Sequence, residues 1–280
     1  MLAAPPATAQ SDSTDPVDPD TGIEARGQAP PLWTAGLFFV AADHAVYPGA
    51  ERRARNATLL PFATWRGPVL RVVGGGAGLR ALRTPRAELD FSAAAAFGSS
   101  GTDTGARAGM PAIGTLVEIG PSLRINLGEL REDGERPPWR LDLPVRTAFD
   151  ASRDLDYAGL SFEPRLNWRL PAIGPWTPSV YASLFFGDRT LNAMYYGVAP
   201  VYATETRPAY EARAGLVATR LGMSWSRLLG RDLRLALHAS VESVKGAANA
   251  GSPVVGRTVD PTLAITLIWT ALRSQEAGVE

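Results

Sequence analysis

Hydrophobic and polar residues alternate along most of the chain from residue 32 onward. In 139–149, WRLDLPVRTAF, the odd positions are almost all apolar, whereas the even positions include Arg140, Asp142 and Arg146. Successive side chains of a β-strand point to opposite faces, so this segment predicts a strand with one apolar face and one charged face. The same alternation recurs in 86–97, 116–127, 160–170, 233–242 and 262–271.

The length of these segments favours strands that cross a membrane. Each has about ten residues, which suits a tilted transmembrane strand, whereas strands of soluble proteins are nearer five or six residues. The sequence therefore predicts an all-β protein, a transmembrane antiparallel up-and-down β-barrel. A soluble β-sandwich with its apolar face inward is the alternative. Aromatic residues near segment ends are typical of interfacial girdles: Trp139, Phe149, Trp168, Trp176, Trp225 and Trp269.

The strand count is open between ten and twelve. Eleven segments alternate or are apolar enough to be strands, but bacterial barrels of this kind have even numbers of strands. The Gly-rich stretch VVGGGAGLRAL, residues 72–82, does not alternate, so the miscount is expected there. The eleven segments are 32–42, 57–65, 69–82, 86–97, 114–127, 138–149, 157–170, 177–187, 212–227, 231–243 and 261–271.

Composition narrows the choice of protein class. The formal net charge is zero, so no basic excess points to nucleic acid, and the absence of cysteine removes disulfides and thiolate metal sites. No apolar run approaches the ~18 residues of a transmembrane helix, so a membrane-spanning form has to be a closed barrel. No phosphate-binding loop and no metal-ligand spacing is found, so no cofactor is expected.

Three regions are expected along the chain. Residues 1–31 begin with an Ala/Pro-rich leader in which Ala7-Thr8-Ala9 resembles the end of a secretory signal peptide. An ordinary disordered leader is the alternative, and 10–31 is predicted to be a flexible, acidic tail. Residues 32–272 are expected to form the barrel, and 273–280 a short C-terminal tail.

Several motifs resemble one family of outer-membrane proteins. The stretch AMYYGVAP contains Tyr195, Tyr196, Gly197 and Val198, and a later loop contains Ser252, Pro253 and Val254. With the upstream stretch LFFVAADHAVYPGA, residues 37–50, these motifs resemble the MipA/OmpV family over about residues 32–270. The resemblance implies a β-barrel in the bacterial outer membrane, in contact with its lipid. It also implies a scaffold that binds a lytic transglycosylase or a murein synthase. The chain departs from the usual aromatic C-terminus of such barrels, because its last aromatic residue is Trp269.

Only one constellation resembles a catalytic site. His238, Ser240 and Glu242 lie on one face of a predicted strand and are the parts of a serine hydrolase, and PagL-type lipid A deacylases carry a similar His-x-Ser. Their face is the polar one, so we expect the three side chains to point into the barrel, away from an acyl chain. The other histidine, His44, is predicted to lie in a loop.

Charged residues on the polar faces are expected to line the lumen. They are Arg140, Asp142, Arg146, Glu163, Arg165, Arg220 and Arg234. In a barrel of ten to twelve strands, side chains can nearly fill the interior, so we expect a plugged or very narrow lumen. The sequence thus favours a non-enzymatic scaffold, with a small pore or transport barrel as the alternative and a lipid A hydrolase as a distant one.

Overall fold

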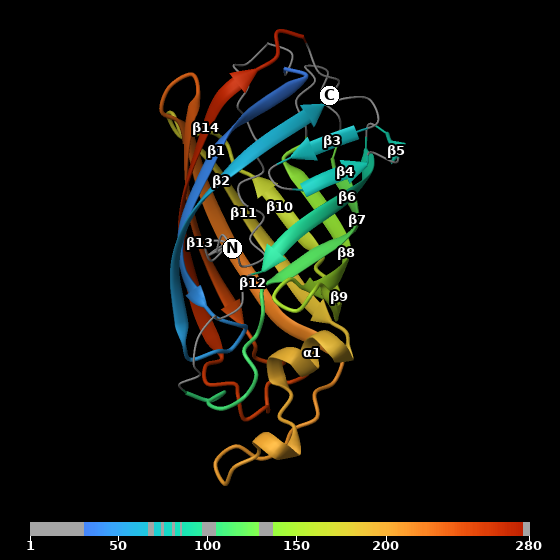
Figure 1. The fold of residues 1–280 in the computed structure, drawn as a ribbon. Coiled ribbons are helices and arrows are strands. Elements are labelled where there is room, and N and C mark those ends of the chain that lie inside the picture. Colours follow the sequence, from blue (N-terminus) through green and yellow to red (C-terminus); the bar gives the residue numbers. More distant parts are fainter. Residues whose placement is uncertain are drawn as a thin grey trace, which may run out of the picture.

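The structure is a computed structural model that describes residues 31–66, 70–73, 76–79, 82–84, 86–96, 105–128 and 137–276. Its strands form one antiparallel sheet that curves into a barrel, and its short helix α1 lies at one end (Figure 1). The strands are β1 Trp33–Ala45, β2 Arg53–Arg66, β3 Leu70–Val73, β4 Gly76–Leu79, β5 Leu82–Arg83, β6 Ala87–Ala96, β7 Leu116–Leu127, β8 Trp139–Asp150, β9 Asp156–Phe162, β10 Arg165–Arg169, β11 Thr177–Gly187, β12 Gly215–Leu228, β13 Leu233–Ser243 and β14 Val259–Arg273. The two helical elements are α1, Arg189–Tyr196, and a 3-10 turn, Pro200–Tyr202.

Neighbouring strands pair in chain order around the barrel. The first strand, β1, pairs with both β2 and the last strand, β14, as an up-and-down barrel requires. At the other end of the ladder β5 pairs with β6, and Cα atoms of β4 lie within 8 Å of Cα atoms of β6. With β4 and β5 counted as one interrupted strand, and β9 and β10 as another, the described residues form 12 antiparallel strands. The predicted fold class is therefore confirmed.

Burial alternates along the strands as the sequence pattern predicts. In β8, Asp142, Arg146 and Ala148 face the interior and are buried, whereas Val145 is 45% exposed on the outer wall. Other apolar side chains on that wall are similarly exposed, such as Leu263 at 60% and Leu221 at 60%. A wall of apolar residues around a polar interior is the arrangement of a transmembrane barrel, and the apolar face of 139–149 belongs to that outer wall.

Three sequence-based predictions need correction. The segment 69–82 is not one strand, because β3 and β4 form a hairpin in which Val73 is paired with Gly76. The segment 157–170 is divided into β9 and β10 at Pro164, which has no N–H to donate to the ladder. His44 does not lie in a loop; it belongs to β1, and its side chain is buried on the inner face.

The two ends of the barrel differ. One end, called the turn end here, has short connections such as 170–176 and 229–232, and it also holds the start of β1 and the finish of β14 (Figure 1). There the N–H of Trp33 donates to the Ser274 hydroxyl at 3.1 Å. The other end carries the long connections and α1. No helix in the described part of the chain is long and apolar enough to cross a membrane.

Candidate functional site: the loop cap and the polar lumen

Helix α1 starts the longest described connection, which joins β11 to β12. Asp188 caps the helix, because its side chain accepts from the Leu191 N–H at 2.8 Å. The helix begins against Gly159 of β9, which has φ +126°, and a Cβ there would collide with Asp188 and Leu191. A glycine is therefore required for the helix to pack this closely on the barrel rim.

Four loops join at this end into one body, called the loop cap here, made of residues 46–52, 105–115, 188–214 and 244–258. The Ser252 hydroxyl donates to the Tyr196 carbonyl at 2.7 Å, and the Tyr196 hydroxyl donates to the Pro48 carbonyl at 3.0 Å. The Tyr47 hydroxyl in turn donates to the Val254 carbonyl at 2.7 Å. These three buried hydrogen bonds tie loops 46–52, 188–214 and 244–258 together.

Arginines attach the fourth loop. Arg207 donates from Nη1 to the carbonyls of Ala106 and Ala108 at 3.0 and 2.8 Å, and Arg107 donates to the Tyr195 carbonyl at 2.9 Å. Because guanidinium groups bond several carbonyls at once, two side chains fix loop 105–115 against loop 188–214.

The centre of the cap is largely apolar. Leu191, Tyr196, Val217, Val244 and Val254 are all fully buried there. Burial raises the pKa of the Tyr196 hydroxyl well above its usual value, because the phenolate would be poorly solvated. Tyr196 therefore stays a neutral hydrogen-bond donor.

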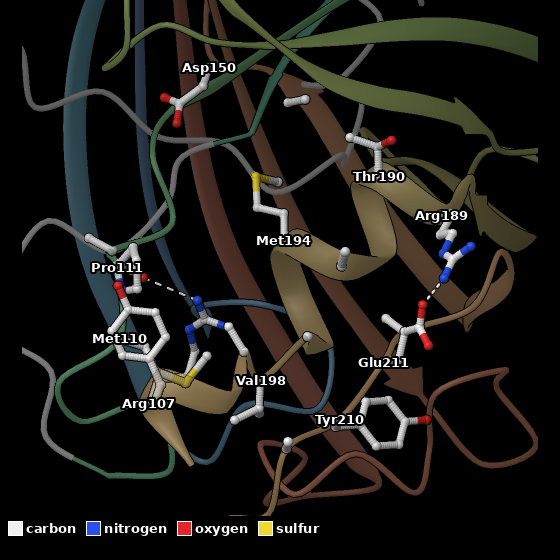
Figure 2. Close-up of a pocket in the computed structure, with 18 of the residues that line it drawn as sticks. Arg107, Met110, Pro111, Asp150, Arg189, Thr190, Met194, Val198, Tyr210 and Glu211 are labelled. Atoms are coloured by element: carbon white, nitrogen blue, oxygen red, sulfur yellow. Dashed lines mark hydrogen bonds and ion pairs between the residues drawn. The ribbon is translucent and has the colours of Figure 1, made fainter.

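A cavity of about 900 Å³ lies beside α1 within the cap (Figure 2). Met194, Val198 and Tyr210 give it apolar surface, and an ion pair between Arg189 and Glu211 stands at its side. Charges of both signs line it, so the cavity has no strong preference for an anion or a cation.

The lumen contains a continuous set of charged contacts on its inner wall. Glu163 accepts from the Ser183 hydroxyl at 2.8 Å and pairs with Arg220 at 3.2 Å and with Arg165 at 3.3 Å. Arg220 also donates to Glu242 at 2.6 Å. Glu163 lies at the junction of β9 and β10, and the other side chains come from β10, β11, β12 and β13, so the network links four adjacent strands of the twelve.

Aromatic rings fill the space between these charges. The Arg165 guanidinium lies 4.5 Å from the Tyr181 ring centroid, and the Tyr181 ring is stacked on His238 at 5.9 Å. Arg220 lies 4.7 Å from the centroid of Phe185. Cation–π contacts of this kind help to keep buried guanidinium groups stable away from water.

The seven charges predicted for the lumen all lie on inner faces of strands or their junctions. Arg140 is partly buried and contacts Asp142 through Nε at 2.9 Å. The other six are no more than 8% exposed: Asp142, Arg146, Glu163, Arg165, Arg220 and Arg234. Charged side chains that line an open aqueous channel would be more exposed to solvent than these six.

The predicted row of His238, Ser240 and Glu242 lies on the inner face of β13. Its three members are paired with alternate residues of β12, Ser224, Gly222 and Arg220, and the Glu242 carboxylate accepts a hydrogen bond from Arg220. The carboxylate that would have to orient the histidine in a hydrolase thus has an arginine as its partner. The His238 ring stacks on Tyr181.

Comparisons with known proteins add a family assignment. The family model described as MltA-interacting protein MipA matches residues 36–271. The chain belongs to the MltA-interacting protein family. The resemblance inferred from the motifs is thereby confirmed, and the two motifs of this MipA-family chain meet in the loop cap at the Ser252–Tyr196 hydrogen bond.

Other comparisons are more distant. None of the curated proteins matches this MipA-family chain significantly. Among solved structures it is similar to the NanC porin, at 10% identity and a TM-score of 0.42, covering 84% of this chain and 99% of that one. It is also similar to a bacterial polysaccharide outer membrane secretin, at 10% identity, a TM-score of 0.36 and coverages of 84% and 98%. A third is Pseudomonas aeruginosa OccK2 in complex with glucuronate, at 13% identity, a TM-score of 0.22 and coverages of 76% and 66%.

The sequence reasoning missed the cap as a body. The sequence does mark the start of its helix, because the alternation of apolar and polar residues stops at Gly187 and Asp188 follows as a helix-capping residue. The contacts that close the cap could not be predicted from the sequence. In each, a side-chain hydroxyl of one loop donates to a backbone carbonyl of another loop that is more than 50 residues away in the chain.

Proposed function

We propose that the protein is a non-enzymatic interaction barrel of the bacterial outer membrane that binds a murein-cleaving or murein-synthesising enzyme. The family match over residues 36–271 carries this proposal, because the family is described by its interaction with MltA. The transmembrane barrel supplies the membrane anchor, and a periplasmic partner is brought to the membrane by binding to it.

The turn end is the surface that this partner would reach. Barrels of this kind have short turns on the periplasmic side and longer loops outside. By that rule the loop cap faces outward and the turn end faces the periplasm, where Ile173 and Leu229 are 58% and 45% exposed. β1 begins at the same end, and the acidic residues of 10–31 that precede it in the sequence can steer a basic enzyme.

Buried family-motif residues have a different role in this proposal. Tyr196 and Val254 are less than 2% exposed, so neither offers surface to a partner. Their role is to hold the loop cap together, and they act on the partner only through the integrity of the barrel.

Site-specific photocrosslinking in intact cells tests the proposal. A photoreactive residue at 173 or 229 is expected to capture a peptidoglycan enzyme, whereas the same residue at 201 should not. Position 201 is a matched control because Val201 is 80% exposed at the tip of the loop cap, at the opposite end. Capture from 201 alone, or from none of the three, would contradict the proposal.

The hydrolase alternative has a separate test. In the proposed role, purified protein releases no fatty acid from lipid A, and Ser240→Ala changes no envelope phenotype. Acyl release that is lost in Ser240→Ala would instead assign the row on β13 to catalysis.

A further inference from the structure

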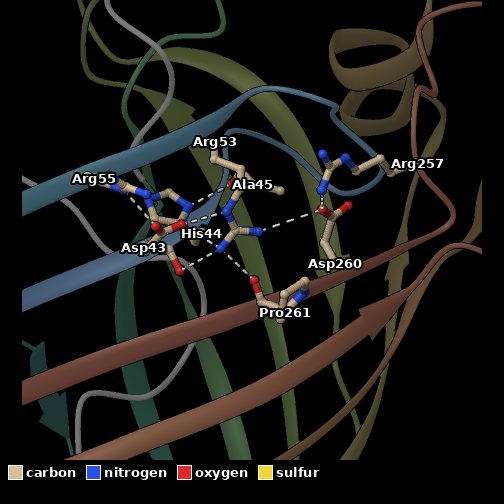
Figure 3. A network of polar contacts seen from close by, with 8 residues as sticks. All are labelled: Asp43, His44, Ala45, Arg53, Arg55, Arg257, Asp260 and Pro261. Carbon is tan, nitrogen blue, oxygen red and sulfur yellow. Dashed lines mark hydrogen bonds and ion pairs between the residues drawn. The ribbon is translucent and has the colours of Figure 1, made fainter.

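A charged cluster interrupts the apolar outer wall near the loop cap (Figure 3). Asp43 of β1 and Arg55 of β2 are paired residues on outward positions, and Arg53 stands one step nearer the cap. Arg53 donates from Nε to Asp43 Oδ1 at 2.6 Å, and Arg55 donates from Nε to Asp43 Oδ2 at 2.8 Å. One carboxylate is therefore shared by two arginines.

The position of the cluster along β1 places it at the membrane boundary. From Trp33 to Ala41 the outward residues of β1 are all apolar, and Asp43 is the first charged one. Ten residues at ~3.3 Å each span ~33 Å of strand, or ~25 Å along the membrane normal at a typical tilt. This equals the height of the apolar band of such barrels, so the cluster lies at the level of lipid headgroups.

The cluster retains positive charge. Arg53 also donates to the Pro261 carbonyl at 2.8 Å and lies 3.7 Å from Asp260, which Arg257 approaches to 3.9 Å. Three arginines thus share two carboxylates. The Arg55 side chain is 86% exposed and contacts Asp43 through Nε, which leaves its terminal nitrogens directed to the surroundings.

An apolar groove of about 750 Å³ continues from the cluster along the outer wall. Asp43 and Arg55 line one part of the groove. The small side chains of Ala41, Ala57 and Ala239 form its floor. The larger side chains Leu237, Leu263 and Ile265 stand beside these alanines. A groove of this kind on a wall that faces hydrocarbon has the shape and polarity to hold an acyl chain.

We propose that the cluster and the groove together bind one lipid with an anionic phosphate headgroup. The phosphate contacts Arg55, whose planar guanidinium suits bidentate bonding to phosphate oxygens, and an acyl chain lies in the alanine-lined groove. Arg53 holds Asp43 in place and so orients Arg55. This inference rests on the transmembrane barrel and not on the proposed murein partner, and the two fail separately.

Native mass spectrometry of the full-length protein tests the site. The protein is purified in detergent, mixed with equal amounts of phosphatidylglycerol and phosphatidylcholine, and the retained lipid is measured. We expect preferential retention of phosphatidylglycerol. Arg55→Gln should lower that retention about fivefold, the effect of one arginine near an anionic headgroup, and leave phosphatidylcholine unchanged.

Two further variants make the result specific. Ala57→Phe fills the groove without changing charge and should also lower retention of phosphatidylglycerol. Arg231→Gln removes the same charge from an exposed turn at the opposite end and should have no effect. Each variant is first shown to be folded by heat-modifiable gel mobility. Equal retention of both lipids by the unaltered protein, or unchanged retention in Arg55→Gln, would overturn the proposal.

Discussion

Glu163 is the residue whose loss should cost the barrel most. It is 4% exposed and lies between Arg165 and Arg220, with the Ser183 hydroxyl on the same oxygen. Desolvation of a carboxylate is unfavourable, and its two arginines and its hydrogen bond offset that cost. Removal of the carboxylate leaves two guanidinium groups buried close together.

We therefore expect Glu163→Ala to destabilise the barrel by about 3–5 kcal/mol, the usual cost of breaking a buried pair from one side. The measurement is urea unfolding in lipid vesicles, followed by tryptophan fluorescence. Glu211→Ala is the matched control, because that carboxylate also pairs with an arginine but is 80% exposed. The control should lose no more than about 1 kcal/mol. Equal losses in the two variants would contradict the buried network.

A substitution at Leu143 tests whether the outer wall of the barrel faces the membrane. Leu143 faces outward near the middle of β8, so Leu143→Arg should cost about 2–4 kcal/mol and reduce assembly into membranes. Val201→Arg makes a similar change in the loop cap, outside the membrane, and should change stability by less than about 0.5 kcal/mol. Both variants are compared by their heat-modifiable folded fraction in membranes. Normal assembly of Leu143→Arg would contradict the lipid-facing assignment.

At the scale of elements, the loop cap depends on a few buried hydrogen bonds between loops. Tyr196→Phe removes the donor to the Pro48 carbonyl and should loosen the cap by about 1 kcal/mol while the barrel stays folded. Limited proteolysis of folded protein reports this as faster cleavage in 188–214. Tyr202→Phe, in the same loop but partly exposed, should cleave at the original rate. Unchanged cleavage of Tyr196→Phe would show that the bond does not hold the cap.

The raised pKa of Tyr196 gives the cap a pH dependence. The unfolded tyrosine ionises near pH 10, whereas the folded one ionises only at a higher pH. The stabilisation is therefore complete below pH 10 and declines as the pH rises above it. We expect cleavage of the cap loops to accelerate above pH 10, and less steeply in Tyr196→Phe. If the cleavage rate rose equally steeply with pH in both proteins, the pH dependence would belong to titratable groups other than Tyr196.

The strands were predictable from sequence, whereas the cap was not. In β8, period-2 alternation alone placed Asp142 and Arg146 inside and Val145 outside. Alternation failed at Gly76, where no side-chain pattern marks the hairpin of β3 and β4, and at His44, which continues β1 beyond its apolar run. The cap is held by side chains that bond distant carbonyls, such as Ser252 to Tyr196, and no local pattern encodes such pairs.

At the scale of the whole molecule, the described residues form a barrel with an apolar wall, an interior that holds buried charges and a cap over one end. Buried charges such as Arg146 at 8% and Arg234 at 4% exposure leave little room for a hydrated path. The cap adds an apolar core around Leu191 and Val217 at its end of the barrel. These features favour a barrel that binds partners at its surface over one that conducts solutes.

Single-channel recording in planar lipid bilayers tests this account most directly. The purified protein is first shown to be folded by heat-modifiable gel mobility and is then added at a concentration at which a porin control inserts readily. We predict no stepwise current in molar salt, because buried charges such as those of the Glu163 network line the inner wall and the loop cap lies at one end of the barrel. Reproducible, ohmic current steps from the unaltered protein would contradict the account and establish a pore.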